Sequence, residues 1–155
     1  MLFSIGLFIH IIGITFIAGG SLGGLVLENQ IWKSLPTSPE KVRVLGPLMP
    51  KYPVIIQAGT LLMLVSGLVM LGALGWSIAS QGWFIAKMLL VVALVLNGLL
   101  VAKPNGIKLR ALIPRLMKGE PVTLEIAKVK RTMTLFHLSE MTMLLLVYLL
   151  AVFRF

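Results

Sequence analysis

The chain has 155 residues, of which 58% are apolar and 12% charged, and its mean hydropathy is +1.01. This composition lies outside the range of soluble domains and is typical of a protein whose solvent is the lipid bilayer. The sequence contains no cysteine, which excludes disulfides, thiolate-held iron–sulfur clusters and thiol catalysis, so a metal would need nitrogen, carboxylate or thioether ligands.

Four apolar stretches are each long enough to cross a bilayer as a helix, which takes about 20 residues. They lie at about 3–27, 53–75, 83–102 and 133–153. No helix breaker follows Pro121, so the fourth helix is predicted over 121–153. The length leaves no room for a second domain, and residues 1–155 are predicted to form a single membrane domain.

The connections between these stretches differ in character. The proline-rich segment 36–51 is predicted to be an ordered loop and not one regular helix. A short turn with tryptophans at both ends, 75–83, makes the second and third helices a hairpin. Residues 105–118 alternate apolar and basic side chains and predict a short amphipathic helix interrupted at Pro114. The predicted fold is therefore an all-α bundle of four transmembrane helices, with an amphipathic cytoplasmic helix between the third and fourth.

Lysine and arginine are concentrated in the first and third connections, whereas the second has none. By the positive-inside rule, loops one and three face the cytoplasm and both termini face outward, in a plasma membrane of the bacterial inner-membrane type. Topology and anionic lipid then explain the net charge of +9, and nucleic-acid binding is not expected. The glycine-rich first helix favours a homo-oligomer or a subunit of a larger membrane complex.

Polar residues within the spans fall into two layers. With a rise of about 1.5 Å per residue, the layer in the cytoplasmic half contains Gln57, Asn97, His137 and Glu140. His137 and Glu140 share a helix face, and a carboxylate in lipid should point inward and find a partner. This inner-leaflet cluster predicts either hydrogen bonds that hold the helices together or a proton relay with Glu140 and His137 as the catalytic residues.

The outer layer contains His10 and Lys87. His10 shares a helix face with several glycines, Gly13 among them, which leave room either for a flat macrocycle or for close helix contact. Because His10 and His137 are predicted in opposite leaflets, they should not ligate the same iron, so a haem b would use one histidine with a different partner. Lys87 either reaches the lipid headgroups or pairs with an anionic cofactor group such as a haem propionate.

A methionine stripe on the last helix offers another interpretation. Met133, His137 and Met141 recur every four residues, and thioether with imidazole is a ligand set that suits Cu(I). The same stripe can equally be apolar filler.

Several segments together resemble a known family. His10-Ile11-Ile12-Gly13 with the following 16–20, then 82–87 opening the third helix, then Ser139-Glu140 in the fourth, is similar to the HemJ-type protoporphyrinogen oxidases and to CopD-like four-helix membrane proteins. The resemblance implies that the first-helix histidine ligates a b-type haem. It also implies that a third-helix lysine, Lys87, and a fourth-helix glutamate, Glu140, lie near the active region.

Three functional hypotheses follow from different classes. The first is a haem-associated redox protein in which His10 holds the iron, Lys87 pairs a propionate, and Glu140 with His137 transfers protons. The second is a non-catalytic subunit of a larger respiratory or electron-transfer membrane complex. The third is a transporter of copper or another small solute. A visible absorption spectrum distinguishes the first from the others, because a b-type haem has a Soret band.

Overall fold

The computed structural model describes residues 1–153, which are mostly helical and contain no strand. The longer helices are α1 (Leu2–Ser34), α3 (Lys51–Leu74), α4 (Gly82–Asn97), α5 (Lys103–Met117) and α6 (Thr123–Phe153). The shorter elements are α2 (Pro39–Leu45), the 3-10 turns η1 (Gly46–Leu48) and η2 (Trp76–Ser80), and the π-helical turn η3 (Gly98–Ala102). Within the described range, four helical stretches are long and apolar enough to cross a membrane. The predicted all-helical architecture with four membrane-length helices is confirmed.

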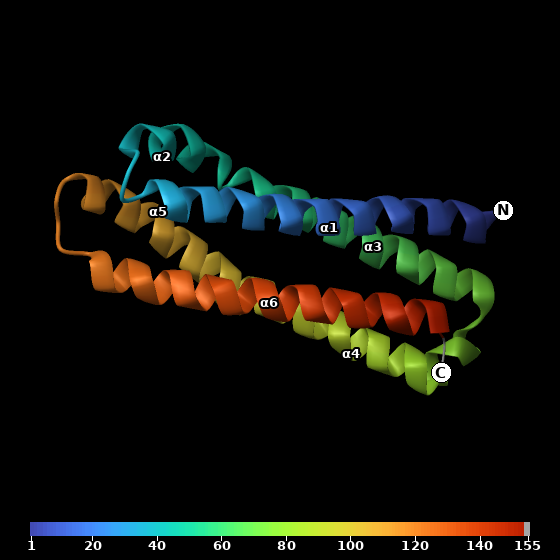
Figure 1. Ribbon diagram of the computed structural model, residues 1–155. Helices are drawn as coiled ribbons and strands as arrows, with labels where there is room; N and C mark the ends of the chain where they lie inside the picture. Colours follow the sequence, from blue (N-terminus) through green and yellow to red (C-terminus); the bar gives the residue numbers. More distant parts are fainter. Residues whose placement is uncertain (154–155) are drawn as a thin grey trace.

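The helices form two antiparallel pairs (Figure 1). α1 lies along α3, and α4 with its continuation α5 lies along α6. Both ends of the described chain and the α3–α4 turn lie together at one end of the molecule, which we call the terminal end. α2 and the α5–α6 connection lie at the opposite end, the loop end.

α1 and α3 approach closely at two facing glycines. A Cβ on Gly13 would lie 2.8 Å from the carbonyl oxygen of Gly59, and a Cβ on Gly59 would lie 2.7 Å from the carbonyl oxygen of Gly13. Both distances are far shorter than an ordinary carbon–oxygen contact, so this approach requires residues without side chains. At this position the glycines serve helix packing.

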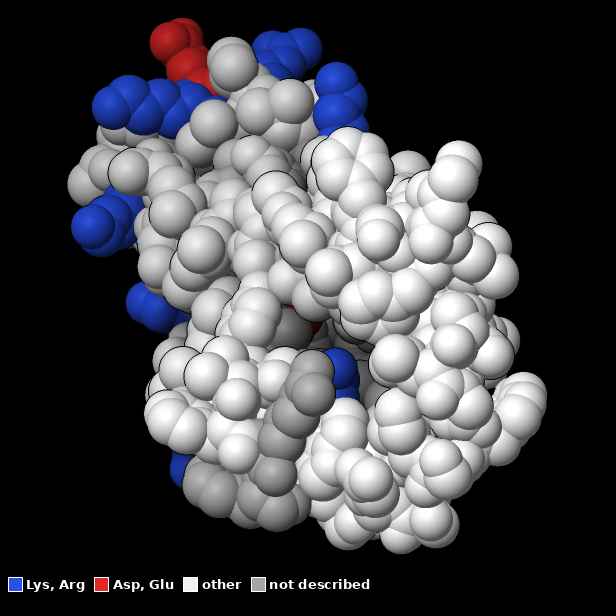
Figure 2. Space-filling view, turned by 90° about the vertical axis from the view of Figure 1, so that its right-hand side faces the viewer, with Lys and Arg blue, Asp and Glu red and all other residues white. Residues whose placement is uncertain are grey.

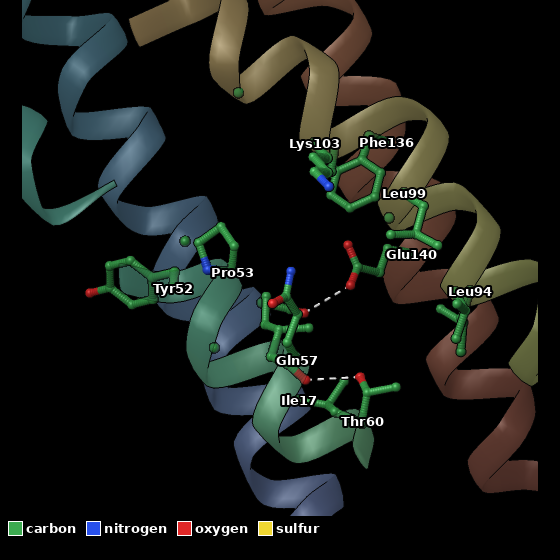
Figure 3. A pocket seen from close by; sticks show the side chains of 18 of the residues that line it. Ile17, Tyr52, Pro53, Gln57, Thr60, Leu94, Leu99, Lys103, Phe136 and Glu140 are labelled. Carbon is green, nitrogen blue, oxygen red and sulfur yellow. Dashed lines mark hydrogen bonds between the residues drawn. The ribbon is translucent and has the colours of Figure 1, made fainter. Parts of the chain in front are cut away.

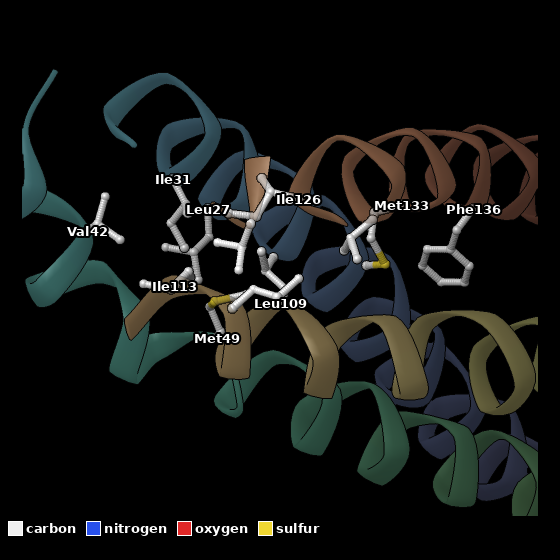
Figure 4. Close-up of a cluster of buried hydrophobic side chains, with 12 residues drawn as sticks. Leu27, Ile31, Val42, Met49, Leu109, Ile113, Ile126, Met133 and Phe136 are labelled. Carbon is white, nitrogen blue, oxygen red and sulfur yellow. The ribbon is translucent and has the colours of Figure 1, made fainter. Parts of the chain in front are cut away.

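The main buried apolar core lies toward the loop end (Figure 4). There α1, α2, α5 and α6 meet around side chains with almost no exposure, which include Ile31, Val42, Leu109 and Val129. Many large apolar side chains along the spans are exposed in the isolated chain, as expected where lipid would cover them. The core therefore joins the two helix pairs at the loop end.

Basic residues gather at the loop end. They come from the end of α1, from α2, from the start of α3, from α5 and from the start of α6. Figure 2 looks at the terminal end, which is mostly uncoloured; blue side chains project around its rim, and a hollow opens in the middle with one basic group at its edge. The charge is therefore distributed asymmetrically along the bundle.

The third helix was predicted to end at residue 102, and this prediction is wrong. The helix runs from Gly82 to Met117, so the amphipathic segment predicted as a separate helix over 105–118 is its continuation, α5. Pro104 has no backbone N–H to donate, and the chain accommodates it by widening the preceding turn into η3. Pro114 also lies inside α5 and does not interrupt it, contrary to the prediction.

Two further boundaries differ from those predicted. α1 continues past residue 27 to Ser34 and thereby includes Glu28. The proline-rich segment predicted as a loop contains α2 and η1, in which Pro39 and Pro47 occupy first-turn positions where the missing N–H costs little.

Candidate functional site

A cavity of about 530 Å³ lies between the two helix pairs. α1 and α3 form one wall, and α4, η3, α5 and α6 form the other (Figure 3). Most of the lining is apolar, and its charged, imidazole and amide side chains are Glu28, Gln57, Lys103, Arg110, His137 and Glu140. A mainly apolar cavity of this size with a few polar groups is typical of a small-molecule site.

Glu28 and His137 form the first polar contact across the cavity wall. The His137 Nε2 atom lies 3.1 Å from Glu28 Oε2, and both side chains are largely buried. The contact joins α1 to α6 and can exist as an ion pair or as a neutral hydrogen bond, depending on where the proton resides. The other ring nitrogen of His137, Nδ1, is buried without a hydrogen-bond partner.

Glu140 forms the second polar contact between the same helices. Ser21 Oγ donates a hydrogen bond of 2.9 Å to Glu140 Oε1. Glu140 is only 7% exposed, and its second oxygen, Oε2, is buried without a partner. Figure 3 shows this carboxyl group directed into the cavity, with Gln57 across from it and Lys103 on its other side. One carboxyl oxygen thus remains for a proton, a water molecule or a ligand.

The inner-leaflet cluster predicted from the sequence is brought together only in part. Gln57, His137 and Glu140 line the cavity, whereas Asn97 faces another side of α6. Asn97 Nδ2 donates a hydrogen bond of 3.1 Å to Ser139 Oγ in a separate, shallow groove. Ser139 precedes Glu140 by one residue, a rotation of roughly 100° around the helix, which places their side chains on different faces.

His10 lies against α3, outside the cavity lining. Its Nδ1 atom is 3.0 Å from the carbonyl oxygen of Met63 and 3.0 Å from Ser66 Oγ. Because a carbonyl oxygen only accepts hydrogen bonds, the contact with Met63 requires that Nδ1 carry the proton. The ring also lies beside Gly67 on α3, where a Cβ would make an ordinary contact of 3.6 Å with His10 Cε1.

The two imidazoles lie at different levels of the bundle. His137 contacts Glu28, which is on the same helix as His10 but roughly 27 Å farther along it by helical rise. This separation agrees with the prediction that the two histidines do not ligate the same iron. Lys87 belongs to the level of His10, because its charge acts on the His10 ring.

The residues predicted to hold haem fit that role unequally. His10 has its proton on Nδ1 and no hydrogen bond to Nε2 among the described residues, as a ligating histidine requires, although it lines neither the cavity nor the shallow groove. Gly13 packs against the α3 backbone, so the space left by its missing side chain is filled by that helix. Lys87 contributes a positive charge near the ring.

Two members of the methionine stripe are engaged in other contacts. Met133 is 3% exposed and packs within the apolar core, and the Nε2 atom of His137 is engaged by Glu28. Over residues 1–153, no group of three or more His, Cys, Asp or Glu side chains is arranged to hold a metal ion. Copper binding stays a prediction without geometric support.

Sequence reasoning missed four of the residues that build these sites. Ser21 and Glu28 are seven residues apart and hence on one helix face, a signal that was available once α1 was extended past residue 27. Lys103 and Arg110 share the same spacing on the third long helix. The third helix was predicted to end at residue 102, which placed Lys103 in the connection and Arg110 in a separate amphipathic helix on the membrane surface.

Comparisons with protein-family models, with curated proteins and with solved structures found no match. The functional argument therefore rests on the geometry of this chain.

Proposed function

We propose that this chain is a membrane-embedded redox protein that binds haem b through His10. The observation that carries the proposal is the hydrogen bond from Nδ1 to the Met63 carbonyl, which leaves Nε2 for the iron. A ligating histidine commonly has its second nitrogen fixed in this way, because the bond sets the tautomer and the ring orientation. Ser66 strengthens the hold on Nδ1 from the same turn of α3.

Lys87 is the second residue of this site. Its charge lies close enough to act on the His10 imidazole, and it is the only Lys or Arg of α4. A lysine at this depth favours an anionic group beside the ring, as a haem propionate would provide. When bound, haem supplies one-electron chemistry whose potential depends on the axial ligand and on the polarity of its surroundings.

Glu140, His137 and Glu28 are proposed to hold and transfer protons at the other level. The imidazole of His137 lies beside the Glu28 carboxyl group, and Glu140 follows one helical turn later with a free oxygen facing the cavity. Carboxyl and imidazole groups placed in succession along helices are the usual means by which protons move within a membrane.

The orientation of the bundle is part of the proposal. The basic loop end faces the cytoplasm, and the terminal end faces outward across a bacterial-type plasma membrane. The concentration of lysine and arginine at the loop end supports this orientation. His10 then lies in the outer half of the membrane, and the Glu28–His137 contact lies in the cytoplasmic half.

The visible spectrum of the purified protein tests the proposed function. We expect a Soret band that shifts on reduction, that is lost in His10→Ala and that persists in His137→Ala, which serves as the matched histidine control. A wild-type protein whose spectrum after addition of haem shows only the band of free haem would overturn the proposal and favour a non-catalytic subunit. Equal loss of the band in both variants would contradict the assignment of the ligand to His10.

A further inference from the structure

Two cations in the cavity wall have no role in the proposed redox site. Lys103 and Arg110 are seven residues apart on α5, lie on one face of it and line the cavity. In the part of the chain that the structure describes, neither forms an ion pair. Lys103 is exposed and Arg110 is half-buried in the isolated chain, so both stand at the edge of the mainly apolar cavity, where two positive charges favour an anionic group.

The wall beside these cations is smooth and apolar. Gly98, Ala102 and Gly106 recur every four residues along the cavity face, and neither glycine has an atom within 4 Å of a Cβ position. We call this strip of small residues the trough; by position along the helix it extends from near Arg110 past Lys103 to the end of α4. A trough of this kind accepts an extended apolar chain lying along the helix.

A buried polar atom independently indicates a bound molecule in the same space. Glu140 Oε2 is buried, has no partner and faces the cavity opposite Gln57 (Figure 3). Polar atoms in this situation are usually satisfied by a ligand or by ordered water. A carbonyl or hydroxyl group next to an acidic head would reach the Gln57 amide and the Glu140 carboxyl group together.

We propose that the cavity binds an amphiphile with an acidic headgroup and an apolar chain. The carboxylate or phosphate lies between Lys103 and Arg110, and the chain occupies the trough formed by Gly98, Ala102 and Gly106. The arrangement disfavours a cationic ligand, because Lys103 and Arg110 stand at the headgroup position. Such a ligand is either a free long-chain acid or an anionic membrane lipid, which share this chemistry. The site is separate from His10 and does not depend on haem.

Spin-labelled probes in phosphatidylcholine nanodiscs test this site on the full chain. The probes are stearate labelled near its chain end, the methyl ester of that stearate, and chain-labelled phosphatidylglycerol with phosphatidylcholine as its neutral counterpart. Motionally restricted probe, measured by electron paramagnetic resonance, reports binding. The charge variant is Lys103→Gln/Arg110→Gln, and its matched control is Lys108→Gln/Lys118→Gln, which loses the same charge from the same helix end outside the cavity lining. Both variants share any change in surface potential.

We expect at least one acidic probe to be restricted more than its neutral counterpart. The cavity variant should weaken that binding about tenfold relative to the control variant, as expected for lost charge-assisted contacts. Restriction of stearate identifies a free acid, and restriction of phosphatidylglycerol alone identifies a lipid.

A second pair of variants tests the same site independently, in case the charge variants do not fold. Gly106→Phe places a ring in the trough and should abolish the preference for the acidic probe, whereas Gly72→Phe, at an exposed and equally open position, should not. Equal binding of acidic and neutral probes, or equal losses in the cavity and control variants, would overturn the proposal. Those outcomes leave the Soret band unaffected, so the two proposals fail separately.

Discussion

Replacing Gly13 with alanine measures how close α1 and α3 are. The added Cβ would lie 2.8 Å from both the Gly59 carbonyl oxygen and the Met63 backbone nitrogen, whereas ordinary contact begins at 3.4 Å. Both obstacles are backbone atoms, so the helices must separate locally by roughly 0.6 Å. A gap of about 0.5–1 Å forfeits a quarter to a half of the dispersion energy at each contact. Overpacking of this kind costs about 1–3 kcal/mol in the free energy of unfolding.

The matched control is Gly19→Ala, on the same helix at a position with no atom within 4 Å of the Cβ. Both variants change helix propensity equally, so their difference isolates the contact with α3. Unfolding in mixed micelles should show Gly13→Ala less stable than Gly19→Ala by about 1–3 kcal/mol. Equal stabilities would refute the close glycine contact and, with it, the placement of His10 against Met63.

Two further predictions concern the loop-end polar contact and the orientation. Glu28→Ala should lower the free energy of unfolding by about 2 kcal/mol, because both ring nitrogens of His137 would then lack a partner. This loss exceeds the average of about 0.6 kcal/mol for a hydrogen bond in a membrane. A double-mutant cycle with His137→Ala checks this, and additive effects would contradict it. Because the chain has no cysteine, single-cysteine variants report sidedness. On intact cells an impermeant maleimide should label Ser77→Cys and not Lys118→Cys; the reverse would invert the topology.

The sequence was sufficient to predict the number of membrane-length helices, because hydropathy over about 20 residues reports the bilayer environment directly. It was also sufficient to separate the two histidines, since helical rise converts position into depth. The continuation of the third helix through Pro104 was not predictable from local rules. These rules end a helix near a proline, whereas the chain absorbs it in a π-helical turn.

The partners of the polar residues depended on helix rotation, which hydropathy does not fix. The depth of Asn97 agreed with that of Glu140, yet its side chain bonds to Ser139 on another face of α6. Glu28 lies beyond the predicted first span, 3–27, whereas in the structure α1 extends to Ser34 and Glu28 contacts His137. Depth was therefore predictable from the sequence, whereas the direction of each side chain required the packed structure.

Chemical rescue of His10→Gly tests the ligand assignment most directly. Glycine removes the imidazole, and free imidazole added to the purified variant can occupy the vacated space beside Met63 and Ser66. We predict that His10→Gly with haem has no wild-type Soret band, and that imidazole restores the band while it leaves His137→Gly unchanged. A wild-type band in His10→Gly without imidazole would contradict haem ligation by this residue.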